Sequence, residues 1–232
     1  PNMFQAENWK HNVVTQVYAL GSDLCALRDS KSFTAGEWQG TQFKSQADGY
    51  AHARTCEFLH TITPGVRVVS EEDSQGHNFL KEELYWLIDP IDGTRSYCEG
   101  YQGFAIQICL MSRGRPTWSC IYAPAESRMY VAQYEGGAFV NGLRLFRPMS
   151  YARRCLIDNY PEPRGIASSV FKNLPATEYV ESGSLGLKIC KVADGQADIF
   201  VKDVETKIWD IAPAELFLTE VGGYLTDLEG RP

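Results

Sequence analysis

The chain has 232 residues, of which 44% are hydrophobic and 22% charged, and its formal net charge is −7. This composition is ordinary for a soluble globular protein with a sizeable core, and the acidic balance disfavours nucleic acid or an anionic membrane as a partner. Seven cysteines without a CxxC spacing and four dispersed histidines favour reduced thiols over disulfides or a zinc site. With no signal peptide or long apolar span in this sequence, we expect a cytoplasmic protein.

The first quarter of the chain alternates helical and polar segments. Apolar residues at spacings of three and four predict a helix over 9–27, and the polar segment 29–43 is predicted to be a loop. Asp48 precedes a second helical pattern and is a candidate N-cap. Pro64-Gly65 ends that helix, and 66–69 is predicted to be a short buried strand.

The middle of the chain carries a series of strand signals separated by turn residues. Gly136-Gly137 and Asn141-Gly142 are turn signals. The pattern predicts a meander of antiparallel character. The expected strands are 84–88, 104–111, 117–122, 129–133 and 138–140.

The last third alternates short strands and helices, so the whole chain is predicted to be a layered α/β fold. Without an internal repeat or a low-complexity linker, we expect one compact unit. It would combine an N-terminal α+β half, 1–150, with a C-terminal α/β half, 151–232. The expected elements here are strands at 155–157, 199–201 and 224–226 and helices at 166–173, from Ser184 onward, and from Asp210 to Gly222-Gly223.

One run of residues is chemically unusual: Asp89-Pro90-Ile91-Asp92-Gly93-Thr94 follows the apolar segment 84–88. Two carboxylates at the end of a buried strand are unfavourable unless a cation accepts them. Pro90 restricts the backbone between them. Gly93 and Thr94 are expected to start a helix, whose free N–H groups would face a phosphate.

Three further acidic residues occur in similar settings, each after a short apolar run or at the start of a helix. Taken singly, Asp48 and Asp210 are ordinary N-caps and Glu71 belongs to a solvated loop. Together with Asp89 and Asp92 they form a set of hard oxygen ligands without histidine or cysteine. Such a set suits Mg²⁺ or Mn²⁺.

The run 89–94 resembles the signature of the inositol monophosphatase superfamily of Mg²⁺-dependent, lithium-sensitive phosphatases. Other segments resemble motifs of the same family, in the same order along the chain. These are Ser45-Gln46-Ala47-Asp48, with Ser for the usual Thr, Val69-Ser70-Glu71-Glu72-Asp73, the hairpin 136–142, and Trp209-Asp210-Ile211-Ala212-Pro213 followed by Val221-Gly222-Gly223. The resemblance runs from about residue 40 to the end, where the family pattern continues for another strand or two, so we expect a truncated C-terminus.

The resemblance implies a layered α/β/α/β/α sugar-phosphatase fold with mixed, largely antiparallel sheets. It also implies two or three Mg²⁺ ions, with Mn²⁺ as a substitute. Asp89 would bridge two ions, with Glu71 on the first-metal side and Asp92 with Asp210 on the second. The implied metal ligands are Glu71, Asp89, the Ile91 carbonyl, Asp92 and Asp210.

The resemblance further implies catalytic and substrate roles. Thr94, helped by Glu71 or Asp48, would orient the attacking water, and the amides of Gly93 and Thr94 would hold the phosphate. The ions would activate that water for hydrolysis of a phosphomonoester. The expected partner is a small phosphorylated metabolite and not a nucleic-acid polymer or a membrane, and a homodimer is a possible assembly.

The motifs point to more than one substrate branch. The 70–73 motif, Gly186-Leu187-Lys188 and the segment 212–215 resemble the 3′(2′),5′-bisphosphate nucleotidase branch, where Lys188 would meet a second phosphate or be a solvated helix lysine. Asp203, seven residues before Asp210, resembles the inositol-phosphate branch or is an exposed loop residue.

The segment Arg95-Ser96-Tyr97 resembles the histidinol-phosphate branch. A bisphosphate nucleotidase is the first prediction, with inositol monophosphatase or histidinol-phosphate phosphatase as alternatives. A non-catalytic metal-binding regulator is the alternative of another class.

Overall fold

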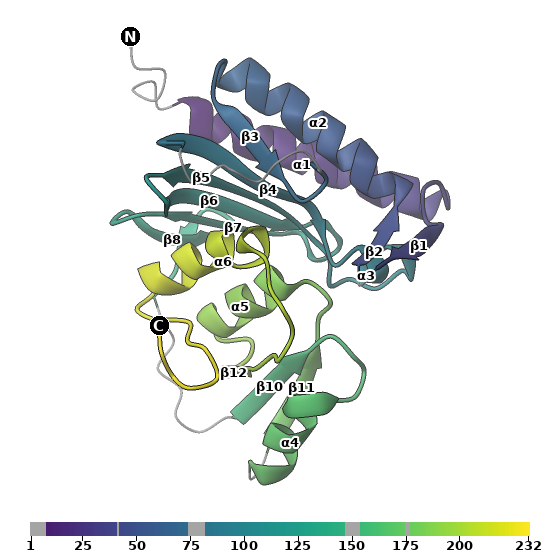
Figure 1. Ribbon diagram of the computed structural model, residues 1–232, viewed down its shortest axis with the longest axis vertical. Helices are drawn as coiled ribbons and strands as arrows, with labels where there is room; N and C mark the ends of the chain where they lie inside the picture. Colours follow the sequence, from purple (N-terminus) through teal and green to yellow (C-terminus); the bar gives the residue numbers. More distant parts are fainter. Residues whose placement is uncertain (1–7, 41, 74–81, 147–153, 175–176) are drawn as a thin grey trace.

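A seven-stranded sheet lies at the centre of the molecule (Figure 1). The computed structural model describes residues 8–40, 42–73, 82–146, 154–174 and 177–232. Strands β3 and β4 run parallel and all other neighbours in this sheet are antiparallel, which confirms the predicted meander. In spatial order the strands are β3 (Arg67–Ser70), β4 (Leu84–Asp92), β5 (Ala105–Ser112), β6 (Arg115–Ala123), β7 (Arg128–Gln133), β8 (Gly137–Val140) and β9 (Leu143–Arg144).

Strand β4 is buried on both faces of the sheet, which explains its nearly continuous apolar sequence. Trp86 and Ile88 belong to the core on one face. Tyr85 and Leu87, which alternate with them, belong to a separate core cluster on the other face. The end of this strand is therefore enclosed between layers, and its last residues are shielded from water.

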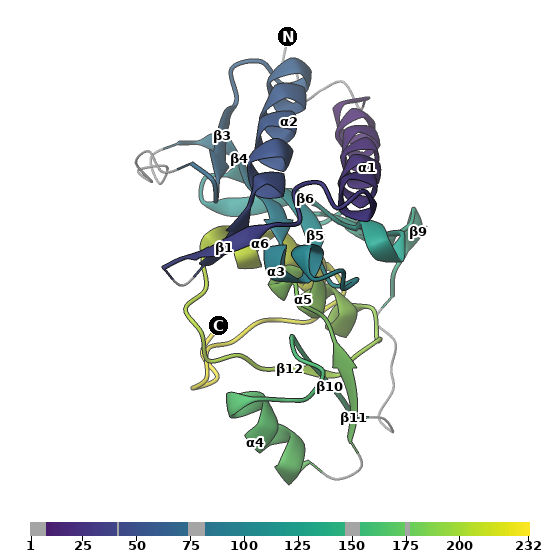
Figure 2. The ribbon, with the colours of Figure 1, turned by 90° about the vertical axis from the view of Figure 1, so that its right-hand side faces the viewer.

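Two helices, α1 (Asn8–Asp29) and α2 (Gln46–Ile62), cover one face of the sheet (Figures 1 and 2). The apolar spacing of α1 places Val13, Val17, Leu20 and Leu24 against the core, each 2% exposed or less. Burial of each such side chain stabilises the fold by about 1.5–3 kcal/mol. Trp9 adds edge-on aromatic packing, with its ring centroid 5.2 Å from that of Trp118.

The opposite face is covered by α5 (Leu185–Ala193) and α6 (Ile208–Glu220). Below them lies a parallel three-stranded sheet in the order β11-β10-β12, followed by α4 (Gly165–Asn173) (Figure 1). The layers are thus α/β/α/β/α, and the predicted fold class is confirmed. The three strands are β10 (Arg154–Asp158), β11 (Thr177–Glu181) and β12 (Ile199–Phe200).

The seven-stranded sheet ends at Arg144 and the second sheet begins at Arg154, close to the predicted division between halves 1–150 and 151–232. That the two halves form one unit stays a prediction. Among the described residues, no helix combines the length and the apolar character needed to cross a membrane.

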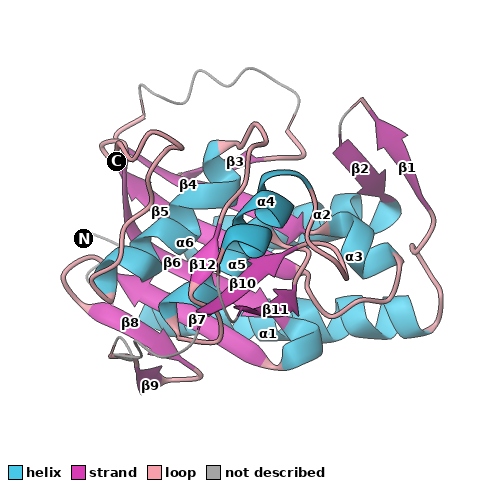
Figure 3. Cartoon of the chain, turned by 90° about the horizontal axis from the view of Figure 1, so that it is seen from below, coloured by secondary structure: helices cyan, strands magenta, loops and turns pink. Residues whose placement is uncertain are grey.

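The segment predicted as a loop over 29–43 contains a β-hairpin, so that prediction was wrong. Strands β1 (Gly36–Gln39) and β2 (Gln42–Ser45) pair antiparallel and lie beside α2 and the short helix α3 (Thr94–Cys98) (Figure 3). All of β1 is exposed, so it lacks the apolar alternation that marks a half-buried strand. Its pairing with β2 was not visible in the local pattern.

Three other local predictions need correction. Helix α2 is capped by Ser45, and Asp48 stands three residues into the helix, where its side chain accepts the Ser45 amide. Helix α6 likewise starts at Ile208, with Asp210 accepting the Lys207 amide. In both helices the acidic residue completes a capping box instead of being the cap itself.

Residues 224–226, predicted as a strand, form none. A strand needs hydrogen bonds from a neighbour, which a short apolar pattern does not specify. A short 3₁₀ helix, η3 (Pro124–Glu126), connects β6 to β7.

Candidate active site

A cavity of about 490 Å³ lies where the end of β4 meets α3, α6 and the β1–β2 hairpin. Every predicted metal ligand lines it, although the residues come from distant parts of the chain. Glu71 follows β3, the aspartates end β4, Thr94 starts α3 and Asp210 lies in the first turn of α6. The predicted residues on its wall are Glu71, Asp89, Ile91, Asp92, Gly93, Thr94 and Asp210.

The backbone at the end of β4 departs from regular strand geometry. Its pairing with β5 shifts register between Asp89 and Asp92, and the Ile91 amide donates to Asp89 Oδ1 over 3.2 Å. Gly93 then adopts a φ of 88°, and a Cβ there would lie 3.0 Å from the Gly103 carbonyl oxygen. A glycine is required at this turn because it must be left-handed and closely packed. The turn sends both aspartates and Thr94 into one cavity.

Asp89 lies at the centre of a group of four carboxyl groups and is 2% exposed. Burial raises its pKa well above the usual range, and the charges of Glu71, Asp92 and Asp210 raise that pKa further. When protonated, the Asp89 carboxyl donates a hydrogen bond to Glu71. Burial followed by the charge of Asp92 raises the pKa of Asp210 to about 7. The site therefore concentrates negative charge where water cannot screen it.

Asp92 is held by the start of α5. Its Oδ2 atom accepts hydrogen bonds from Ser184 Oγ at 2.5 Å, from the Gly186 amide at 2.9 Å and from Gln107 Nε2 at 2.9 Å. Burial nevertheless raises the pKa of Asp92, because these hydrogen bonds do not offset the loss of hydration. One carboxylate oxygen is thus committed to the scaffold.

Thr94 and Asp48 form a buried pair. Thr94 Oγ1 lies 2.7 Å from Asp48 Oδ1 and 3.2 Å from the Ile91 carbonyl oxygen, both of which accept. Asp48 is 1% exposed, and its other oxygen accepts the Ser45 amide at 2.7 Å. Because its proton points to Asp48, the Thr94 oxygen can accept a hydrogen bond from a water in the cavity. Asp48 itself does not line the cavity and contacts it through Thr94.

Lys44, on β2, is a site residue that the sequence reasoning missed. Its Nζ atom lies 2.8 Å from Glu71 Oε1 and 2.5 Å from Glu72 Oε1. Gln42 Nε2 donates to the same Glu71 oxygen over 2.9 Å. Burial raises the pKa of Glu71, although the Lys44 charge opposes that change. A strand prediction for this segment would have placed Gln42 and Lys44 on one face.

These residues fit a hard divalent cation by their chemistry, since every candidate ligand is an oxygen and the charges of Glu71, Asp92 and Asp210 all raise the pKa of Asp89. Within the described ranges, however, no three His, Cys, Asp or Glu side chains are arranged as a ready-made metal site. Glu71, Asp92 and Asp210 each have an oxygen bound to a protein donor. A metal would therefore compete with protein donors for part of this site.

Lys188 and Asp203, the predicted substrate contacts, lie outside this cavity wall. Lys188 is 1% exposed, which excludes the solvated alternative, and its Nζ donates to Asn159 Oδ1 at 2.8 Å and the Gly183 carbonyl at 3.1 Å. Burial, then the charge of Lys202, lowers the pKa of Lys188 to about 7. Asn159 and Gly183 do line the cavity, so Lys188 supports its wall. Asp203 lines a separate groove between α5, α6 and 225–232.

Aromatic and basic side chains also line the cavity, and of these only Arg95 was singled out from the sequence. Trp38 of the hairpin is 61% exposed and lines the cavity, as do Tyr101, Tyr160 and Arg164. The Arg164 guanidinium carbon lies 4.4 Å from the Tyr160 ring centroid, within cation–π distance. Arg95 also lines the cavity, with Nε 2.7 Å from Glu99 Oε1.

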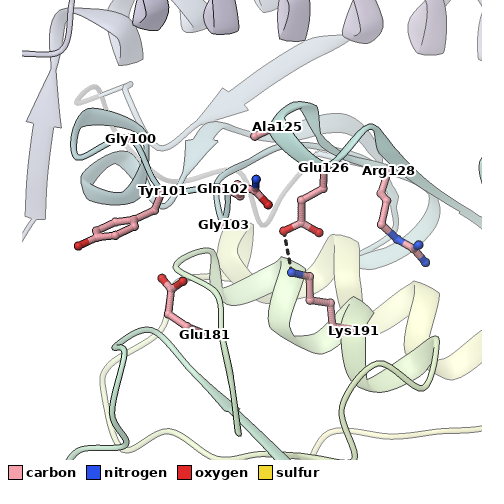
Figure 4. Close-up of a pocket in the computed structure, with 9 residues that line it drawn as sticks. All are labelled: Gly100, Tyr101, Gln102, Gly103, Ala125, Glu126, Arg128, Glu181 and Lys191. Atoms are coloured by element: carbon pink, nitrogen blue, oxygen red, sulfur yellow. Dashed lines mark hydrogen bonds and ion pairs between the residues drawn. The ribbon is translucent and has the colours of Figure 1, made fainter.

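A second, shallower hollow lies between the 100–103 loop, η3 and α5 (Figure 4). Glu126 and Lys191 form an ion pair of 2.7 Å across it, and Arg128 is bonded to Asp194 at 2.6 Å. None of the predicted site residues lines this hollow. Its paired charges connect the main sheet to α5 and do not extend the carboxylate group.

The amino-acid sequence is similar to known proteins of one family. The sequence profile of the inositol monophosphatase family matches residues 10–232. The 3′(2′),5′-bisphosphate nucleotidase CysQ of Escherichia coli O157:H7 is 30% identical over 95% of this chain and 87% of its own length. The Nus factor SuhB of Vibrio cholerae is 26% identical over 88% of this chain and 79% of its own length.

Solved structures show the same architecture. The extragenic suppressor protein SuhB of Bartonella henselae superposes with a TM-score of 0.81 at 25% identity, covering 95% of this chain and 88% of that one. CysQ of Bacteroides thetaiotaomicron gives a TM-score of 0.78 at 20% identity, covering 95% and 89%, and supports the fold alone.

Proposed function

The chain belongs to the inositol monophosphatase family and is a phosphoric monoester hydrolase, and we propose that it hydrolyses a small phosphorylated nucleotide with the help of divalent metal ions. The observation that carries the proposal is the cavity in which four carboxyl groups and the Thr94 hydroxyl converge. Mg²⁺ is the first choice of ion, in two or three copies, because it prefers carboxylate oxygens and phosphate.

The metal ligands in this proposal are Glu71, Asp89, Asp92 and Asp210, with the Ile91 carbonyl. When bound, the ions would lower the pKa of the attacking water and stabilise charge on the phosphate oxygens. They would also relieve the repulsion that raises the pKa of Asp89. The fit is chemical, and Mn²⁺ satisfies it as well.

Thr94 and Asp48 provide the protein's own contribution to the reaction. The Thr94 hydroxyl donates a hydrogen bond to Asp48 Oδ1, with the two oxygens 2.7 Å apart. This leaves a lone pair on the Thr94 oxygen to hold and orient one water. That water attacks phosphorus, the ester oxygen leaves as the alcohol, and inorganic phosphate is formed. Gly93 and Thr94 line the cavity, and their backbone amides would bind the phosphate there. Orientation of the water is the main effect of this pair.

A 3′(2′),5′-bisphosphate nucleotide is the proposed substrate. CysQ relatives carry this activity in their names and match 80–95% of the chain. The aromatic side chains Trp38 and Tyr160 offer faces to a nucleobase, and Arg164 offers a bidentate donor to a second phosphate. Lys188, held to Asn159, would support that wall from behind.

Two alternative functions are also supported by observations. The family of this chain is named for inositol monophosphatase, which favours an inositol phosphate, the substrate class with which Asp203 was associated. The SuhB relatives are named as Nus factors, which favours a regulator without catalysis. The Thr94–Asp48 pair argues against a regulator, since a metal-binding scaffold does not require a water-orienting hydroxyl.

A phosphate-release assay separates these functions. The wild-type protein with Mg²⁺ would be compared on adenosine 3′,5′-bisphosphate, inositol 1-phosphate, histidinol phosphate and fructose 1,6-bisphosphate. We expect the highest kcat/KM for the nucleotide, and inhibition of its hydrolysis by Li⁺. Preference for inositol 1-phosphate would support the first alternative. Release from none of the four would support the regulator.

A further inference from the structure

Lys44 places a permanent positive charge inside the carboxylate site. The residue is 9% exposed on β2, and its ammonium group contacts Glu71 and Glu72 at 2.8 and 2.5 Å. Both distances are those of close ion pairs, and the three side chains are largely shielded from water, which would otherwise screen their charges.

The position of this ammonium group is set by the backbone. Strand β2 ends at Ser45, which caps α2, and Asp48 accepts the Ser45 amide in the capping box. Gln42 and Lys44 alternate on one face of the strand, and both donate to Glu71 Oε1. The hairpin therefore holds two N–H donors on a single carboxylate oxygen.

This arrangement has two consequences for a cation at Glu71. The Oε1 atom is already engaged by two donors, so a metal there must displace them or use the other oxygen. The ammonium charge also repels a dication in an environment where water screens poorly.

We propose that Lys44 replaces one divalent cation on the Glu71 side of the site and so weakens metal binding there. The proposal rests on the proposed function, because it presupposes a divalent-metal site. It makes Glu71 an internally neutralised ligand, whereas among the described residues Lys188 and Lys207 act on Asp92 and Asp210 at longer range, without a direct ion pair. Lys44 is a positioning residue, since its contacts are with Glu71, Glu72 and not with the cavity.

Lys44→Met tests the proposal, because methionine is also long and unbranched but carries no charge. Mn²⁺ binding to the whole chain would be followed by isothermal titration calorimetry. We expect the variant to gain one bound ion, or to bind its weakest ion with a Kd about tenfold lower than wild type. The matched control is Lys10→Met on α1, where the lysine contacts Gln133 far from the cavity, and its Kd should not change.

A second variant removes a negative charge instead of a positive one and keeps the size of the original side chain. Glu72→Gln removes the second partner of Lys44, so the ammonium group interacts with Glu71 alone, and Mn²⁺ binding should weaken. Glu82→Gln removes an equal charge from an exposed glutamate that pairs with Arg67 at 3.3 Å. We expect a larger rise in Kd for Glu72→Gln than for Glu82→Gln.

Thermal unfolding with and without Mn²⁺ gives an independent readout. Lys44→Met should show a larger rise in Tm on adding metal than wild type, because a ligand that binds the folded state more tightly stabilises it more. Unchanged stoichiometry and Kd in Lys44→Met would overturn the proposal. Weaker binding would also overturn it, because Lys44 would then be preparing Glu71 for metal.

Phosphate release, measured in parallel, separates this inference from the proposed function. If wild type binds Mn²⁺ but releases no phosphate from any substrate, the proposed function fails and the Lys44 comparison still decides the inference. If neither wild type nor Lys44→Met binds Mn²⁺, both are overturned.

Discussion

At the scale of single residues, Thr94 and Asp92 each bind the surrounding protein and keep hydrogen-bonding capacity for a ligand. The Thr94 hydroxyl donates a hydrogen bond to Asp48 and keeps a lone pair for water, while one oxygen of Asp92 accepts the Gly186 amide of α5. Such committed contacts fix orientation before any ligand arrives, which reduces the entropy lost on binding. They also predict that small side-chain changes act on rate more than on folding.

Thr94→Val removes the hydroxyl while keeping the shape of the side chain. We expect kcat to fall about a hundredfold with a small change in KM, because the water loses its orienting acceptor. Thr94→Ser should recover most of the activity, since it restores the hydroxyl next to Asp48. Steady-state phosphate release measures both.

The matched control is Thr15→Val on the exposed surface of α1, where the hydroxyl only contacts the His11 carbonyl. Its kcat should equal that of wild type. Full activity in Thr94→Val would remove Thr94 from the mechanism.

At the scale of elements, α5 links the second half of the chain to the end of β4. Ser184 caps this helix by accepting the Leu187 amide at 3.0 Å and also donates to Asp92. One side chain therefore starts a helix and fixes a site carboxylate. The hairpin β1–β2 has a similar double role, because it carries Trp38 to the cavity and Lys44 to Glu71.

Ser184→Ala should destabilise the protein by about 1–2 kcal/mol, because the helix loses its cap and buried Asp92 loses a donor. Urea unfolding monitored by circular dichroism measures this change.

Ser169→Ala, on the exposed face of α4, provides the comparison and should leave stability within about 0.5 kcal/mol of wild type. Equal effects of the two substitutions would show that Ser184 contributes neither the cap nor the contact.

At the scale of the whole molecule, the cavity lies where layers meet, and each layer supplies a different kind of group. The main sheet and α6 supply carboxylates, and the segment after β10 supplies Asn159, Tyr160 and Arg164 (Figure 1). In the proposed function, catalysis and substrate choice would therefore depend on different layers. This separation agrees with a family in which one reaction is applied to several phosphate esters.

Arg164→Ala tests that separation. We expect kcat/KM for adenosine 3′,5′-bisphosphate to fall about tenfold or more, because a charge-assisted contact to the second phosphate is lost. The value for adenosine 5′-monophosphate, which has one phosphate, should change much less. Relative kcat/KM on the two nucleotides is the measurement.

Lys172→Ala is the control for charge, since it removes a cation from the exposed face of α4 away from the cavity. It should affect both nucleotides equally. A uniform loss in Arg164→Ala would mean that Arg164 acts on the shared phosphate or on folding.

The local sequence predicted the layered fold and the meander, and the family resemblance supplied the site residues, seven of which line the cavity, from Glu71 to Asp210. Strand and helix periods follow from which face is buried, and carboxylates at the end of an apolar strand demand a partner. These signals are carried by neighbouring residues, so they can be read without a structure.

Only the tertiary structure placed Lys44 against Glu71, Lys188 behind the cavity wall, and Asp203 in another groove. Each of these placements depends on contact between distant segments: β2 with the residues after β3, α5 with the residues after β10, and 225–232 with α5. Contacts of this kind are set by packing and loop geometry, which leave no periodic trace in the chain. The sequence alone thus determines which carboxylates the site contains. The tertiary structure decides which lysines and backbone donors neutralise or bind them.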